Sequence, residues 1–253
     1  IGGLGRHISV FITPTGRSAV LLAEDAQRTI RLRSLEAQYY RALLQHSFGE
    51  QHLQGNISTF WSGASCRDIS FVLPHIHIAV HAATLAEHCT NASSSDQARI
   101  SIWERDIQTG AIAFQEVTPH PECKIEAAGC TIYLDQGARD QLFEMRQRAL
   151  PNETGGVLLG YYDFNINALI VVCGLPAPED SISTPTSFVR GVKGVHESVT
   201  EANRRTAGIV SYIGEWHSHP TGCSIMPSGD DLEQVAYLIE NMEAEGLPAL
   251  QII

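Results

Sequence analysis

The sequence lacks several features that would assign the protein to a large functional class. No stretch approaches about 18 consecutive apolar residues, and the amino terminus lacks the charged, then apolar, then small-residue order of a secretory signal. No basic run appears, and the formal net charge of −11 disfavours a phosphate-backbone partner such as nucleic acid. We therefore predict a soluble cytoplasmic protein that binds neither membranes nor nucleic acids.

The cysteines and most histidines also lack the spacing of a metal or disulfide framework. The six cysteines form no C-x-x-C pair, so reduced thiols are expected. Cys66 is interpreted as a small buried thiol rather than a nucleophile. The cluster of His75, His77, His81 and His88 has no carboxylate or thiol spacing to complete a site, so core or surface roles are expected for it.

The length and composition indicate two folded modules. A chain of 253 residues, of which 43% are hydrophobic and 18% charged, fits two domains of about 125 residues each. Proline-containing residues 119–122 form a plausible hinge, so we place the boundary near residues 118–128. The chain begins at Ile1 without a methionine and stops within an apolar segment at Ile253. We expect a piece of a longer polypeptide with a truncated final strand.

Hydrophobic periodicity predicts an α/β protein. In the first half, the pattern predicts a helix over residues 29–44, a strand or turn leading into a helix over 68–89, and a hairpin over 100–114. In the second half, strands are predicted at residues 131–134, 156–161, 169–174, 187–190, 209–215 and 247–253, and helices at 138–149, 195–206 and after Ser228.

The chemistry-bearing residues lie in the second half. His217 and His219 stand at i and i+2 on the end of a predicted strand, so their side chains share one face. A catalytic zinc site takes three protein ligands and leaves a fourth position open, and an acidic oxygen often serves as the third ligand. Asp231 or its neighbour Asp230 can supply that oxygen. Glu153, between a helix and a strand with two glycines, is the candidate general base.

Ser228 has two possible roles. It stands where the N-cap of the following helix should be, three residues before Asp231. Its hydroxyl can also reach a developing oxyanion beside the metal.

These residues resemble a known pattern. Glu153, followed by His217-Ser-His219-Pro and then Ser228-Gly-Asp-Asp231, resembles the E, H-x-H-P and S-x-x-D pattern of the JAB/MPN (JAMM) metalloproteases. The resemblance implies an α/β/α sandwich with a mixed sheet over residues 128–253. It also implies His217, His219 and Asp231 as zinc ligands, Glu153 as the base and Ser228 as the oxyanion donor.

The spacing departs from that pattern at one point. Eight residues separate His219 from Ser228, where the family has seven, so counting from the histidine favours Asp230 and counting from the serine favours Asp231. We favour Asp231, because a loop absorbs an extra residue more easily than a helical turn does.

The resemblance implies one catalytic zinc ion and cleavage after the tail of a ubiquitin-like protein, either from a precursor or from a conjugate. The tail could add as a strand near Gly155 and Gly156. In bacteria, such an enzyme fits an antiviral conjugation system. The alternatives are a catalytically silent MPN scaffold and an accessory domain of an ATP-dependent activating enzyme.

The first half carries a weaker resemblance. Residues 62–70, Ser-Gly-Ala-Ser-Cys-Arg-Asp-Ile-Ser, are similar to the region after the adenylation core of bacterial ThiF-type activating enzymes. We therefore expect a smaller, activating-enzyme-like α/β segment over residues 1–120. No glycine-rich nucleotide loop is present, so an ATP site would lie upstream of Ile1.

Overall fold

A computed structural model describes residues 5–54, 59–61, 69–71, 73–127, 129–223, 226–244 and 246–253. The chain divides into two compact units. One comprises Ile1–Pro121 with Arg205–Ala207, and the other comprises Glu122–Arg204 with Gly208–Ile253.

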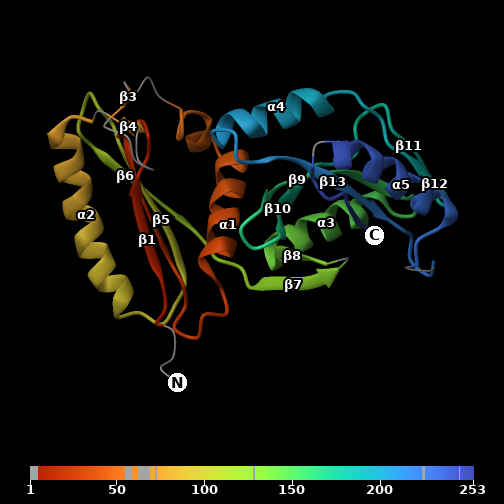
Figure 1. Ribbon diagram of the computed structural model, residues 1–253, viewed down its shortest axis with the longest axis horizontal. Coiled ribbons are helices and arrows are strands. Elements are labelled where there is room, and N and C mark those ends of the chain that lie inside the picture. Colours follow the sequence, from red (N-terminus) through yellow and green to blue (C-terminus); the bar gives the residue numbers. More distant parts are fainter. Residues whose placement is uncertain are drawn as a thin grey trace. The chain divides into compact units, whose positions relative to one another are not determined.

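The first unit is built on a four-stranded antiparallel sheet of order β1-β2-β5-β6. Its strands are β1 (Ile8–Ile12), β2 (Ser18–Ala23), β5 (Arg99–Arg105) and β6 (Ile112–Val117). Figure 1 shows α1 (Leu32–Gln45) and α2 (His75–Ser93) on opposite sides of this sheet. Every residue of β2 is buried, because both faces of this central strand are covered.

Short elements complete the first unit. A 3-10 helix (Ser47–Glu50) follows α1, and β3 (Thr59–Trp61) pairs with β4 (Ile69–Phe71) in a separate hairpin. Cys66 and most of the segment carrying the activating-enzyme resemblance lie outside the described residues.

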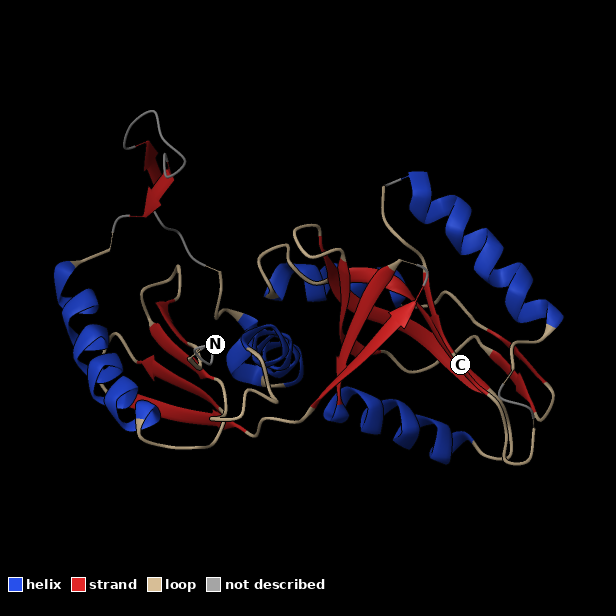
Figure 2. Ribbon diagram, turned by 60° about the horizontal axis from the view of Figure 1, so that its bottom comes forward, coloured by secondary structure: helices blue, strands red, loops and turns tan. Residues whose placement is uncertain are grey.

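The second unit contains a six-stranded mixed sheet of order β14-β13-β9-β10-β8-β7. Its strands are β7 (Glu122–Ala127), β8 (Cys130–Asp135), β9 (Thr154–Asp163), β10 (Ala168–Gly174), β13 (Ser211–Ser218) and β14 (Leu250–Ile252). Figure 2 shows this sheet with helices on both of its sides. The mixed α/β architecture agrees with the predicted fold class.

Three helices and a hairpin surround the second sheet. The helices are α3 (Gln136–Ala149), α4 (Val195–Arg205) and α5 (Gly229–Ala244), and β11 (Ile182–Thr184) pairs with β12 (Ser187–Val189). The Asp135 side chain accepts hydrogen bonds from the amides of Gly137 and Ala138, which caps α3. The core joins Leu142 of α3 to sheet residues that include Leu158 and Trp216.

Most elements agree with the periodicity of the sequence, and two do not. Residues 122–127 lie within the region 118–128 where the boundary was predicted, and they form strand β7 of the second unit, which pairs with β8 and was not predicted as a strand. Strand β11 (Ile182–Thr184) was likewise not predicted from the sequence. No helix within the described residues combines the length and apolarity needed to cross a membrane.

Candidate metal centre

The two histidines lie at the end of β13. Its pairing with β9 sets His217 opposite Gly155 and Ser218 opposite Thr154. The register of the two strands shifts between Tyr212 and Gly214, and Gly214 has a φ of 150°. A Cβ at Gly214 would lie 2.0 Å from the carbonyl oxygen of Leu250, so only glycine fits this bulge.

Contacts on both sides of β13 fix the histidine backbone. Trp216 points to the opposite face, and its indole Nε1 donates to the carbonyl oxygen of Leu175 at 2.8 Å. The Ser218 hydroxyl donates to the carbonyl oxygen of Thr154 at 3.2 Å. Arg146 of α3 donates from Nε to the carbonyl oxygen of His219 at 2.9 Å. The strand end therefore cannot rotate without breaking three hydrogen bonds.

Asp231 is held in place by the cap of α5. The Ser228 hydroxyl accepts from the Asp231 amide at 3.1 Å, while the Asp231 carboxylate accepts from the Ser228 amide and hydroxyl, each at 2.7 Å. This reciprocal arrangement is a capping box, so the predicted N-cap is confirmed. Asp231 is only 2% exposed. The side chain of Asp230 lies outside the described part of the chain.

Glu153 directly precedes β9 and faces His217. Its Oε2 lies 3.0 Å from His217 Nε2, and its side chain is mostly buried. Its backbone amide donates to the carbonyl oxygen of Thr184 in β11 at 2.8 Å. The position of Glu153 thus depends on both the histidine and the hairpin.

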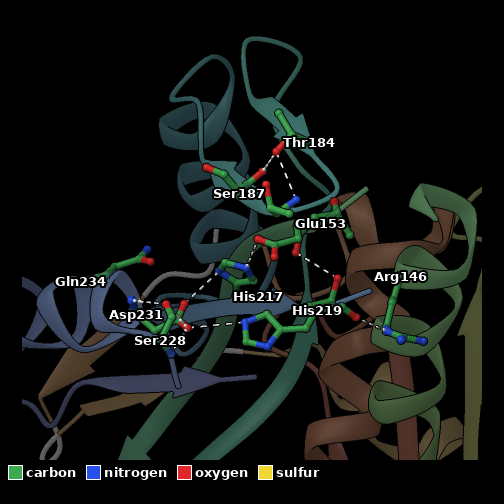
Figure 3. Close-up of polar contacts among 12 residues, drawn as sticks. Arg146, Glu153, Thr184, Ser187, His217, His219, Ser228, Asp231 and Gln234 are labelled. Carbon is green, nitrogen blue, oxygen red and sulfur yellow. Dashed lines mark hydrogen bonds and ion pairs between the residues drawn. The ribbon is translucent and has the colours of Figure 1, made fainter. Parts of the chain in front are cut away.

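The four side chains converge as a metal site would require (Figure 3). Ligand atoms of Glu153, His217 and His219 all lie within 4.8 Å of one another. Asp231 Oδ1 lies 3.3 Å from His217 Nδ1, and Asp231 Oδ2 lies 3.5 Å from His219 Nε2. Two ligands of one tetrahedral zinc stand about 3.3 Å apart, because zinc bonds to nitrogen and oxygen are about 2.0–2.2 Å long. The donor types therefore suit zinc, and the two distances from Asp231 are close to this separation.

The electrostatics of Asp231 favour the ionised form that binds metal. Burial alone would raise the pKa of this carboxyl. The two hydrogen bonds from Ser228 and the nearby His217 and His219 outweigh burial and hold the pKa below its ordinary value. Asp231 is thus a carboxylate at neutral pH, available to a cation.

A cavity of about 470 Å³ opens onto the four side chains. The tip and second strand of the β11–β12 hairpin line one wall, where the Phe188 ring meets the His217 ring at 75° with 5.7 Å between centroids. Gln234 of α5 and Cys223 line other parts. The four side chains therefore line a pocket rather than a closed core.

Sequence reasoning missed the residues that support the site. Arg146, Phe188 and Gln234 carry no motif, because each contributes through a contact between elements distant in the sequence. The amphipathic pattern of α3 places its apolar face but does not reveal that Arg146 reaches the backbone of His219.

The histidines of α2 lie in other environments. His81 is buried, and its Nε2 is 3.0 Å from the carbonyl oxygen of Gly16. The His88 ring lies 4.5 Å from the Trp103 ring. Among the residues that the structure describes, the group of Glu153, His217 and His219 is the one with metal-ligand spacing.

Comparison with known proteins assigns the family. Residues 135–252 match the family described as prokaryotic homologs of the JAB domain. The chain belongs to this family, and the predicted JAB resemblance is confirmed. The match begins at residue 135, so the activating-enzyme resemblance of residues 1–120 stays a prediction.

Two curated relatives carry functional names. A CD-NTase/cGAS isopeptidase of Enterobacter hormaechei subsp. hoffmannii (strain UCI 50) is 34% identical over 128 residues, which cover 51% of this chain and 69% of that protein. The probable metalloprotease y4qB of Sinorhizobium fredii (strain NBRC 101917 / NGR234) is 24% identical over 122 residues, 48% of this chain and 74% of that protein. Family and relatives together support a metal-dependent hydrolase of peptide or isopeptide bonds.

Proposed function

We propose that this chain is a zinc-dependent isopeptidase or peptidase that cleaves after the carboxy-terminal tail of a ubiquitin-like protein. The observation that carries the proposal is the convergence of Glu153 and Asp231 on His217 and His219 in one pocket. The relative named as a CD-NTase/cGAS isopeptidase supports a protein conjugate as the substrate.

In this proposal, His217, His219 and Asp231 hold the zinc ion. A bound zinc ion would act as a Lewis acid that polarises the substrate carbonyl and lowers the pKa of water. Asp231 is preferred to Asp230 because its carboxylate is buried and faces both histidines. Both imidazoles and the carboxylate line the pocket, where a substrate would meet them.

Glu153 acts as the general base in this proposal. Its carboxylate lies on the pocket wall beside His217, where it can accept a proton from the attacking water and return it to the departing amine. Ser228 donates a hydrogen bond to the oxygen that gains charge during attack, in addition to capping α5. The Ser228 hydroxyl has to turn from Asp231 for that second role.

Gly155 and Gly156 border the site on β9, and the β11–β12 hairpin stands beside them. An extended tail can lie along this region by backbone hydrogen bonds, which require little side-chain information.

Cleavage of defined fusions tests the proposal. Ubiquitin is joined through its terminal glycine to a reporter by a peptide bond in one substrate and by a lysine isopeptide bond in the other. We expect zinc-dependent cleavage of at least one substrate, loss of cleavage in Glu153→Gln with zinc retained, and loss of both cleavage and zinc in His219→Ala. A folded protein that binds no metal and cleaves neither substrate would favour the silent scaffold.

A further inference from the structure

A partly buried ion pair lies beside the candidate metal centre. Glu215 precedes His217 by two residues on β13, so both side chains leave the same face of the strand. Glu215 is 4% exposed, and Arg190, directly after β12, donates from Nη2 to its Oε1 at 2.8 Å. The Tyr212 hydroxyl donates to the same oxygen at 3.3 Å, and the Gln234 amide donates to Oε2. Both carboxylate oxygens therefore have partners from three different elements.

The base of the β11–β12 hairpin is closed by its own hydrogen bonds. The Asp180 carboxylate accepts from the amides of Val192 and Lys193, each at 3.0 Å. The Ser181 hydroxyl accepts from the Gly191 amide at 3.0 Å. Because the two legs are tied together at this point, the hairpin is expected to move as one piece.

The other end of the hairpin contacts the reacting groups. The carbonyl oxygen of Thr184 accepts from the Glu153 amide at 2.8 Å, and the Phe188 ring packs edge-on against His217. A hairpin that moves as one piece would carry both contacts with it. The position of Arg190 against Glu215 is thus coupled to the positions of Glu153 and His217.

We propose that Arg190 and Glu215 are positioning residues, whose ion pair seats the hairpin so that it aligns Glu153 and His217 for the reaction. The inference rests on the proposed peptidase function. Such an ion pair is a poor source of stability, because desolvation of the buried carboxylate offsets the attraction. It does fix geometry, since a guanidinium and a carboxylate associate along defined directions.

A purely structural role for the pair makes a different prediction. In that case, losing the pair would lower activity only as far as it lowers the folded or zinc-loaded fraction. In our proposal, the folded, zinc-loaded enzyme itself becomes slower, because the hydrogen bond from the Glu153 amide to Thr184 opens more often.

The experiment compares three variants with the wild type. Arg190→Met removes the charge but keeps most of the side-chain volume, and Glu215→Gln keeps the shape but removes the opposite charge. Lys193→Ala is the matched control, since it removes an exposed ion pair with Glu179 at the base of the same hairpin. Zinc content, kcat and KM on the ubiquitin fusions, and hydrogen exchange of the Glu153 amide are measured for each.

We expect Arg190→Met and Glu215→Gln to retain about one zinc per chain, because neither variant changes a proposed zinc ligand and a folded chain keeps the ligands together. Exchange of the Glu153 amide should accelerate, and kcat should fall on the order of 100-fold with a smaller change in KM, because small misplacements of reacting groups have effects of that size. Lys193→Ala should match the wild type. If Arg190→Met does not fold, Arg190→Lys serves instead, because it keeps the charge but loses the planar fork.

The inference would be overturned by wild-type kcat and wild-type exchange of the Glu153 amide in the folded variants. It would also be overturned if the loss of kcat followed the loss of zinc in proportion. If the wild type neither binds zinc nor cleaves, the proposed function fails. The exchange of the Glu153 amide then still decides whether the ion pair seats the hairpin.

Discussion

Gly155 occupies a space beside the candidate site that no side chain can enter. A Cβ at this position would lie 2.4 Å from the carbonyl oxygen of Trp216 and 2.8 Å from Phe188 Cε1. Ordinary contact begins near 3.4 Å, so the backbone of β13 would have to retreat by about 1 Å. That retreat displaces His217, which pairs with Gly155 across the sheet. We predict that Gly155→Ala costs about 1–3 kcal/mol of stability and lowers kcat/KM about 100-fold.

Gly160→Ala separates the expected loss of stability from the expected loss of kcat/KM. Gly160 lies on the same strand but away from the site, and a Cβ there would lie 2.0 Å from the carbonyl oxygen of Ile170. Both variants should show similar losses in the free energy of unfolding, measured with urea. Only Gly155→Ala should lose kcat/KM on the ubiquitin fusions under conditions where both proteins are fully folded. Equal activity of the two variants would refute the argument that the Gly155 contact positions the site.

Three further predictions concern single side chains. Ser228→Ala should lower the free energy of unfolding by about 1 kcal/mol, as loss of an N-cap does, and should lower kcat on the order of 100-fold or more, as loss of an oxyanion donor does. Asp135→Ala, which removes the cap of α3, should show a similar loss of stability in unfolding experiments but an unchanged kcat. Arg146→Met should weaken zinc binding roughly 10-fold to 100-fold in competition with a chelator, because the backbone of His219 loses a fixed partner. Burial lowers the pKa of His52 to about 4, so below about pH 6.5 the unfolded chain binds a proton at His52 that the native chain does not bind. The free energy of unfolding should therefore fall by about 3 kcal/mol as the pH is lowered from about 6.5 to about 4. His52→Phe should flatten this pH dependence in unfolding titrations.

The positions of the candidate site residues could be anticipated because each is tied to a local pattern. Alternation along a strand places His217 and His219 on one face, and the cap signature places Ser228 and Asp231 at a helix start. Glu153 is different, since 63 residues separate it from His217 in the sequence, and no local pattern places the two side chains together. The structure brings Glu153 to His217 because β9 and β13 are antiparallel neighbours.

The contacts that hold these residues could not be predicted from the sequence. Arg190 and Glu215 look like ordinary charged residues of a loop and a strand, and their pairing depends on how the hairpin folds back over β13. The strand β7 was missed because its residues Glu122–Ala127 alternate polar and apolar side chains only weakly, and most are exposed or half-buried. In such segments, pairing with a neighbouring strand, rather than the intrinsic β-propensity of the residues, determines whether a strand forms.

We propose above that His217, His219 and Asp231 hold one zinc ion. The most direct test is the metal content, by mass spectrometry, of the folded wild type and of four variants in which His217, His219, Asp230 or Asp231 is replaced by Ala. We predict about one zinc per chain in the wild type and in Asp230→Ala, and none in the other three variants. No zinc in the folded wild type after metal is supplied would contradict it, as would full zinc content in Asp231→Ala.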